Sequence, residues 1–181
     1  MFGVQCLGMD VPTIKSFMPS ELEVIYKAWQ KNINTPFSSS AGRLIDALAS
    51  LLGVCQFNNY EGQAAMMLEE LYQPSIKNVY PYYIENGVID WAPMFEAVLI
   101  GSSTQKIVSM FINTLAEIVL TIARDVRLKN VCLSGGVFQN DPLTRKVMDL
   151  LTKDFDVFSQ TNTPPNDGGL ALGQAVYGGL V

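Results

Sequence analysis

The sequence VCLSGGVFQNDPL, residues 131–143, indicates the fold more clearly than any other part of the chain. A short apolar strand runs into Ser134, Gly135 and Gly136, and a helix opens near Asn140. Glycines after a strand let backbone N–H groups approach an anion closely, and the first helical turn adds unpaired N–H groups and the positive end of its dipole. The stretch therefore predicts a cradle for phosphate or carbamoyl oxygens.

The same residues also fit a simpler interpretation. A strand can turn tightly into a helix with Asn140 or Asp141 acting only as a cap. The carboxylate of Asp141 also argues mildly against an anion bound at that helix end. Both interpretations stay open on the local sequence.

Working outward, the C-terminal half alternates between helices and strands. We expect a long apolar helix over 104–126 with Ile107, Phe111, Leu115, Ile118 and Ile122 on one face. A strand at 130–133, a helix at 142–152, a strand at 155–158 and a helix at 167–177 should follow. That order is typical of an α/β layer.

The N-terminal half reads as mostly helical. We expect an extended lead-in over 1–18, then helices over 19–32, 41–52, 60–71 and 92–100, with short strands around a turn at Asn86-Gly87 within 74–90.

Composition limits the function classes. The chain has 181 residues, enough for one domain, of which 49% are hydrophobic and 16% charged. The longest apolar stretch, 112–123, is interrupted by Glu117 and is too short to span a bilayer, so we expect no membrane segment. A net charge of -5 disfavours nucleic-acid binding.

The cysteines indicate the cellular compartment, and the absence of histidine limits the metal sites that the chain can form. The chain has three scattered cysteines and nothing resembling a secretory signal, which favours a reducing cytoplasm. It has no histidine, the commonest nitrogen ligand of transition metals and the commonest general base. A histidine-dependent site would need residues from elsewhere.

A second glycine-bordered motif is TPPNDGGLALGQA, residues 163–175. Asn166 can cap the helix, and the two following glycines leave the region beside Asp167 sterically open. Asp167 could bind a metal, or it could simply favour the helix dipole. Because transition metals usually take three or four protein ligands, the partners of Asp167 would have to come from outside this chain.

Two further motifs lie upstream, SSSAGRLIDALASLLG at 38–53 and NYEGQAAMMLEELY at 59–72. Ser38 to Ser40 can cap the first helix, in which Leu44, Leu48, Leu51 and Leu52 form an apolar stripe. Small residues at its start leave room for a purine or ribose, although an ordinary capped amphipathic helix with Arg43 and Asp46 on the solvated side is the more common interpretation. The second motif carries Glu61-Gly62 near its start, and its two methionines, Met66 and Met67, are more typical of core than of a cofactor site.

In order, the strings SSSAGRLIDALASLLG, YEGQAAMMLEELY, LSGGVFQN and PPNDGGLALGQA resemble the successive signatures of the HypF family of nickel-iron hydrogenase maturation carbamoyltransferases. The resemblance covers about 34–178. It implies the helix-rich second lobe of an α/β fold of the sugar-kinase, Hsp70 and actin (ribonuclease H-like) type. It divides the chain into a lead-in with an N-terminal helix, 1–33, and a C-terminal lobe, 34–181.

The resemblance also implies an activity. HypF enzymes use carbamoyl phosphate and ATP to form a carbamoyl adenylate. They transfer its carbamoyl group to the C-terminal cysteine of the partner HypE, from which a cyanide ligand of the hydrogenase iron is made. Nothing in this chain resembles the segment that makes the adenylate or the histidine-bearing first lobe, so we expect the chain alone to be inactive and to need the remainder of HypF.

The family's site residues carry over by position, as implications of the resemblance. Asp167 matches a metal-binding aspartate that joins two histidines of the first lobe around iron or zinc. The nucleotide, ATP or AMP, is expected at Ser39, Gly42, Gly53, Gly135, Gly136 and Asn140. Weaker matches for substrate contacts are Arg43, Asp46 and Glu61.

Two alternatives remain open. The chain could be a separate nucleotide-binding or interaction module that forms a homodimer through exposed apolar surface. It could also keep the fold and carbamoylate a tRNA or a small hydroxylated metabolite, although the acidic charge speaks against tRNA.

Overall fold

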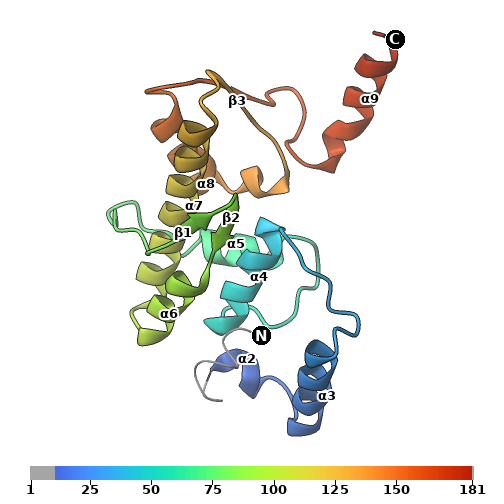
Figure 1. The fold of residues 1–181 in the computed structure, drawn as a ribbon, viewed down its shortest axis with the longest axis vertical. Helices are drawn as coiled ribbons and strands as arrows, with labels where there is room; N and C mark the ends of the chain where they lie inside the picture. The colour runs from blue at the N-terminus through green and yellow to red at the C-terminus, as the bar shows by residue number, and fades with distance from the viewer. Residues whose placement is uncertain (1–10, 181) are drawn as a thin grey trace. The chain divides into compact units, whose positions relative to one another are not determined.

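The computed structural model describes residues 11–180, and the chain divides into two compact units. The first unit includes residues up to Leu71 together with Tyr80–Ile107, and the second comprises Tyr72–Val79 and the chain from Val108 onward. Both are coloured along the chain in Figure 1. The expected division into a lead-in, 1–33, and a C-terminal lobe, 34–181, stays a prediction.

The first unit is mostly helical. Its helices are α2 (Pro12–Lys15), α3 (Pro19–Gln30), α4 (Ala41–Leu51), α5 (Gln63–Glu69) and α6 (Ala92–Ile100). Strands β1 (Tyr83–Glu85) and β2 (Val88–Asp90) pair antiparallel. The turn between them has positive φ at both Asn86 and Gly87, the geometry of a two-residue hairpin, as the Asn-Gly pair predicted.

Helix α4 is the packing centre of this unit. The Ser40 side chain accepts a hydrogen bond from the Arg43 N–H and caps the helix, as the serine run predicted. Ile45, Leu48 and Ala49 are buried on its inner face, whereas the remaining leucines of the predicted stripe are only partly covered.

Three expectations for this unit are wrong. Met66 and Met67 are not in the core, since they are 55% and 36% exposed. Within the lead-in, residues 12–15 form helix α2, because Pro12 fixes a helical φ at the first position and Ile14 becomes buried; residues 1–10 lie outside the described part. The helix expected over 60–71 covers only Gln63–Glu69. It starts late because Gly62 has φ +81 and ends the preceding turn in a left-handed conformation.

The second unit has the predicted α/β order. It contains most of α7 (Thr104–Val126), then β3 (Asn130–Leu133), the short 3-10 turn η1 (Gly136–Gln139), α8 (Asp141–Leu151), β4 (Asp156–Ser159), the 3-10 turn η2 (Asp167–Gly169) and α9 (Leu170–Gly178). Strands β3 and β4 pair in parallel, with Val131 opposite Val157 and Cys132 opposite Phe158. The fold is mixed α/β and rich in helix.

Helix α7 supplies the core of the second unit. Phe111, Leu115 and Ile118 are buried as predicted, but Ile122 is 41% exposed. By length and composition the whole helix could cross a membrane, unlike the shorter stretch 112–123 on which the expectation of no membrane segment was based. In the structure 67% of its most apolar window is buried within the protein.

Buried polar residues of α7, which hydrophobic periodicity could not reveal, hold the segment Tyr72–Val79. The Ser109 hydroxyl accepts a hydrogen bond from the Gln73 N–H at 2.8 Å. The side-chain amide of Asn113 donates to the carbonyls of Ile76 and Asn78 at 2.9 and 3.1 Å. Because the Asn113 side chain is fully buried, it fixes this segment against the helix.

We predict that Asn113→Ala lowers the free energy of unfolding by about 3 kcal/mol, because it leaves two carbonyls without their donor and opens a small cavity. Ile122→Ala on the same helix should cost about 1 kcal/mol or less, since that side chain is half exposed. Urea unfolding followed by circular dichroism measures both. Equal losses in the two variants would contradict this account of the segment.

Candidate functional site

The two glycine-bordered loops predicted from the sequence lie side by side in the second unit. The Gly135 N–H donates a hydrogen bond of 2.7 Å to the Pro165 carbonyl. A methyl group added at Gly136 would lie 3.8 Å from Cβ of Asn166. The loop after β3 and the loop before α9 therefore contact one another directly.

The two glycines have different reasons to be there. Gly135 has φ 109 and ψ 153, a backbone conformation essentially restricted to glycine, so it is required by the turn itself. Gly136 has no positive φ, and a Cβ there would make only ordinary van der Waals contacts. Gly136 is thus not required by the fold, which fits a surface that something approaches closely.

Asn140 is the N-cap of α8, so it does cap the helix, as the simpler interpretation of this residue expected. Its side-chain oxygen accepts a hydrogen bond of 3.0 Å from the Leu143 N–H. Its side-chain NH₂ has no partner among the described residues and stays available as a donor. One amide can both cap the helix and bind a ligand.

Two backbone donors beside Asn140 are also unpaired. The N–H groups of Gly136 and Val137 open the η1 turn, and neither has an acceptor in the described part of the chain. The negative charge that argued against an anion here is reduced, because Asp141 forms an ion pair of 2.8 Å with Arg145.

Asp167 is exposed at the first position of η2. Asn166 does the capping, since its side-chain oxygen accepts from the Gly168 N–H at 3.0 Å. The Asp167 carboxylate makes no hydrogen bond or ion pair with any described residue. Among residues 11–180 no group of three or more metal-binding side chains surrounds it, so further ligands would have to come from outside.

The remaining six predicted residues lie in the first unit. Ser39 and Gly42 flank the Ser40 cap of α4, and the Ser39 side chain is exposed. Arg43 and Asp46 pair with each other at 3.3 Å. Arg43 is exposed, as the simpler interpretation expected, whereas Asp46 is partly buried and also accepts a hydrogen bond from the Asn58 side chain.

The other two of these six are further along the chain. Gly53 follows the end of α4 and lies against the ring of Pro12, a structural position, and its binding role stays a prediction. Glu61 is exposed and unpaired among the described residues.

Sequence reasoning missed the residues that hold the two loops together. The Pro165 carbonyl accepts from Gly135, and the Gln160 side chain donates to the Ser134 hydroxyl at 2.9 Å. A backbone acceptor has no sequence signal, and an isolated glutamine after a strand gives none either.

Helix α9, which follows Asp167, has no buried residue. Its large apolar side chains, together with that of Leu180 two residues beyond its end, are more than half exposed: Leu170, Leu172, Val176, Tyr177 and Leu180. In Figure 1, α9 stands clear of α7 and α8 of the same unit. This face has the character of a surface that another protein segment covers.

Comparisons with known proteins show the family of this chain. The model of the family "Carbamoyltransferase, Kae1-like Domain, second subdomain" matches residues 5–174. The carbamoyltransferase HypF of Rhodobacter capsulatus is 40% identical over 151 residues, 81% of this chain and 20% of that protein. HypF of Synechocystis is 35% identical over 154 residues, again 81% of this chain and 20% of the relative.

Solved structures give the same result. A crystal structure of full-length HypF in the phosphate- and nucleotide-bound form matches with a TM-score of 0.87 and 35% identity, over 98% of this chain and 25% of that one. HypF of T. kodakarensis matches with a TM-score of 0.76 and 32% identity, over 99% of this chain and 24% of that one. The chain spans about a fifth to a quarter of these proteins, and it belongs to the HypF carbamoyltransferase family as the second subdomain of its Kae1-like domain.

Proposed function

We propose that this chain forms one wall of the carbamoyl-transfer site of a HypF enzyme, with the two loops around Asn140 and Asp167 facing the nucleotide. The observation that carries the proposal is the direct contact between these loops, through the 2.7 Å hydrogen bond from Gly135 to Pro165. The shared fold with a HypF solved with phosphate and nucleotide bound supports a nucleotide as the ligand.

The unpaired donors suit that ligand. The N–H groups of Gly136 and Val137 and the side-chain NH₂ of Asn140 have no partner among the described residues. Donors already fixed in position stabilise phosphate oxygens without reorganisation. Because Gly136 has no side chain, the nucleotide can approach the backbone closely.

The reaction follows from the carbamoyl adenylate that the family resemblance implies. A thiolate of the acceptor attacks the carbamoyl carbon, the bond from that carbon to the phosphate oxygen breaks, and AMP leaves. The thiol proton passes to solvent or to a base outside this chain. Negative charge that grows on the AMP phosphate is stabilised by the loop donors. We propose the C-terminal cysteine of HypE as the acceptor and the cytoplasm as the compartment.

Asp167 is the one residue of this chain that we propose as a metal ligand. Its carboxylate is exposed and free of partners within the described residues, which fits an iron or zinc ion completed by two histidines from the rest of HypF. When bound, such an ion would neutralise phosphate charge. The other two interpretations, a separate dimerising module and a tRNA or metabolite acceptor, are not favoured, since the relatives compared above are HypF proteins.

Gly136→Ala should weaken AMP binding at least tenfold in the enzyme assembled from this chain and the remaining segments of HypF, because the new methyl group occupies the nucleotide's approach. It should leave the melting temperature of the chain within about 2 °C, since the methyl group fits the fold. Gly178→Ala, at the end of α9 with open space around it, is the control and should keep wild-type affinity. Calorimetry measures the affinities, and unchanged binding in Gly136→Ala would count against the loop.

Asp167→Asn should remove at least 80% of the bound iron or zinc from the assembled enzyme, because an amide is a much poorer ligand than a carboxylate. The variant should fold normally, since Asp167 pairs with no described residue. Metal content is measured by mass spectrometry of the purified assembly. The matched control is Asp125→Asn, an exposed carboxylate on α7. Equal metal in both variants would exclude Asp167 as a ligand.

The isolated chain should form no AMP from ATP and carbamoyl phosphate, and mixing it with the remaining HypF segments should restore carbamoylation of HypE. The reason is that the chain spans only about a fifth of its relatives and has no histidine. Mass spectrometry of HypE detects carbamoylation as an addition of about 43 Da, because the group CONH₂ replaces the hydrogen of the thiol. AMP formation by the chain alone, or no transfer by the mixture, would contradict the proposal.

A further inference from the structure

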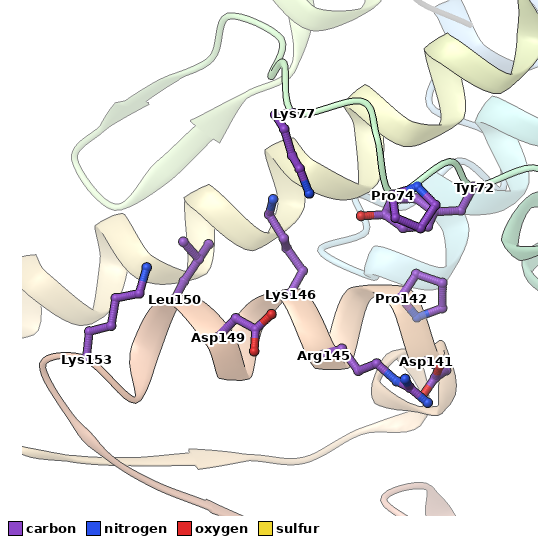
Figure 2. Close-up of a pocket in the computed structure, with 10 residues that line it drawn as sticks. All are labelled: Tyr72, Pro74, Lys77, Asp141, Pro142, Arg145, Lys146, Asp149, Leu150 and Lys153. Carbon is purple, nitrogen blue, oxygen red and sulfur yellow. The ribbon is translucent and has the colours of Figure 1, made fainter.

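A groove of about 590 Å³ lies within the second unit, between helix α8 and the segment that begins at Tyr72. Figure 2 shows its lining, with α8 along one side and Lys77, Pro74 and Tyr72 on the other. No predicted site residue lines it, and the function proposed above does not use it. One end, at Asp141 and Pro142, begins at the residue that follows Asn140.

Both walls of the groove are fixed in position before any ligand arrives. One wall, the segment Tyr72–Val79, is held on α7 by hydrogen bonds from Asn113 to two of its carbonyls and by the bond from Gln73 to Ser109. The other wall, α8, buries Leu143, Val147 and Leu151 on its inner face. A groove with rigid walls loses little entropy when it binds a partner.

The groove is basic in an acidic protein. Four of the chain's 12 lysines and arginines line it, against two aspartates. Asp141 and Arg145 pair at 2.8 Å, which leaves three lysines and Asp149. None of the three lysines, Lys77, Lys146 and Lys153, has an ion pair or hydrogen bond with a described residue.

Two of these lysines face each other. In Figure 2 the ammonium groups of Lys77 and Lys146 extend from opposite walls into the space between them. Like charges that converge repel one another unless an anion lies between them. The arrangement therefore favours a negatively charged ligand.

The shape and the apolar lining favour a peptide over a small anion. Helix α8 has 11 residues, so the groove follows it for about 16 Å, the length of about five residues of extended chain. Pro74, Pro142, Leu150 and the ring of Tyr72 provide apolar surface between the charges. Burial, together with the nearby charge of Asp149, raises the pKa of Tyr72, and its hydroxyl donates a hydrogen bond of 3.5 Å to the side-chain oxygen of Asn113.

We propose that this groove docks an acidic, extended segment of the acceptor protein and leads its reactive thiol toward the loop at Asn140. This inference rests on the function proposed above and adds the docking surface to it. The net charge of -5 repels acidic proteins in general, so the groove is the place where an acidic segment gains attraction and the correct orientation.

The test is binding of fluorescently labelled HypE, from the same organism, to this chain and to the assembled enzyme. Lys77→Glu with Lys146→Glu should weaken binding at least tenfold at 50 mM salt, and less at 500 mM, where charges are screened. Lys77→Gln with Lys146→Gln, which cannot introduce repulsion, should give a smaller loss. The matched control is Lys31→Glu with Lys106→Glu, two exposed lysines with no partner among the described residues, and it should change affinity less than twofold.

Transfer by the assembled enzyme separates this proposal from the proposed function. The groove variant should raise KM for HypE at least tenfold and leave kcat and the KM for ATP unchanged. Wild-type transfer combined with an unchanged KM for HypE in the groove variant would overturn the docking site alone, whereas absent transfer by the wild type would overturn the proposed function. The docking site would also be overturned if the control variant lost as much affinity, or if HypE did not bind the wild-type chain. It would likewise be overturned if the groove variant lost binding of inorganic phosphate or tRNA and kept binding of HypE.

Discussion

The hydrogen bond from the Gly135 N–H to the Pro165 carbonyl holds the candidate site together, because it joins two loops that are 30 residues apart in the chain. It can form only because Gly135 adopts φ 109, a conformation that residues with a side chain avoid. Because of this bond, the loop that carries the unpaired N–H groups of Gly136 and Val137 adjoins the loop that carries the unpaired carboxylate of Asp167. Neither loop alone contains both the cluster of unpaired donors and the unpaired carboxylate.

The scaffold behind these loops explains why they can stay in place without a ligand. Strands β3 and β4 pair in parallel directly before the two loops, so the sheet sets where each loop starts. Asn140 caps α8 with its oxygen and leaves its NH₂ free, which lets one side chain serve both the fold and a ligand. The basic groove begins at the residue after Asn140, so binding of a partner and binding of a nucleotide would use the same helix.

Sequence reasoning succeeded where local chemistry fixes the outcome. The Asn86-Gly87 turn, the Ser40 cap and the order of strands and helices after residue 104 were all predicted, since turn residues, caps and apolar periodicity act within a few residues. The family resemblance assigned site residues to both glycine-bordered loops, whereas the spacing of the two motifs carries no information on the contact between them.

The failures have physical causes too. Ile122 fits the apolar face by spacing but lies near the end of α7, where less of the protein covers the helix. The roles of Ser109 and Asn113 were not predicted, because these residues hold a distant segment through a backbone N–H and two backbone carbonyls that no sequence pattern marks. Helix α5 was predicted too long because the left-handed conformation of Gly62 depends on tertiary packing.

Hydrogen–deuterium exchange of the assembled enzyme, with and without AMP, tests most directly whether the two loops form one nucleotide-binding wall. The account predicts slower exchange in peptides covering both 134–140 and 163–169 when AMP is present, with saturation at the same nucleotide concentration. Protection of only one loop, or of neither while AMP binds elsewhere, would contradict it.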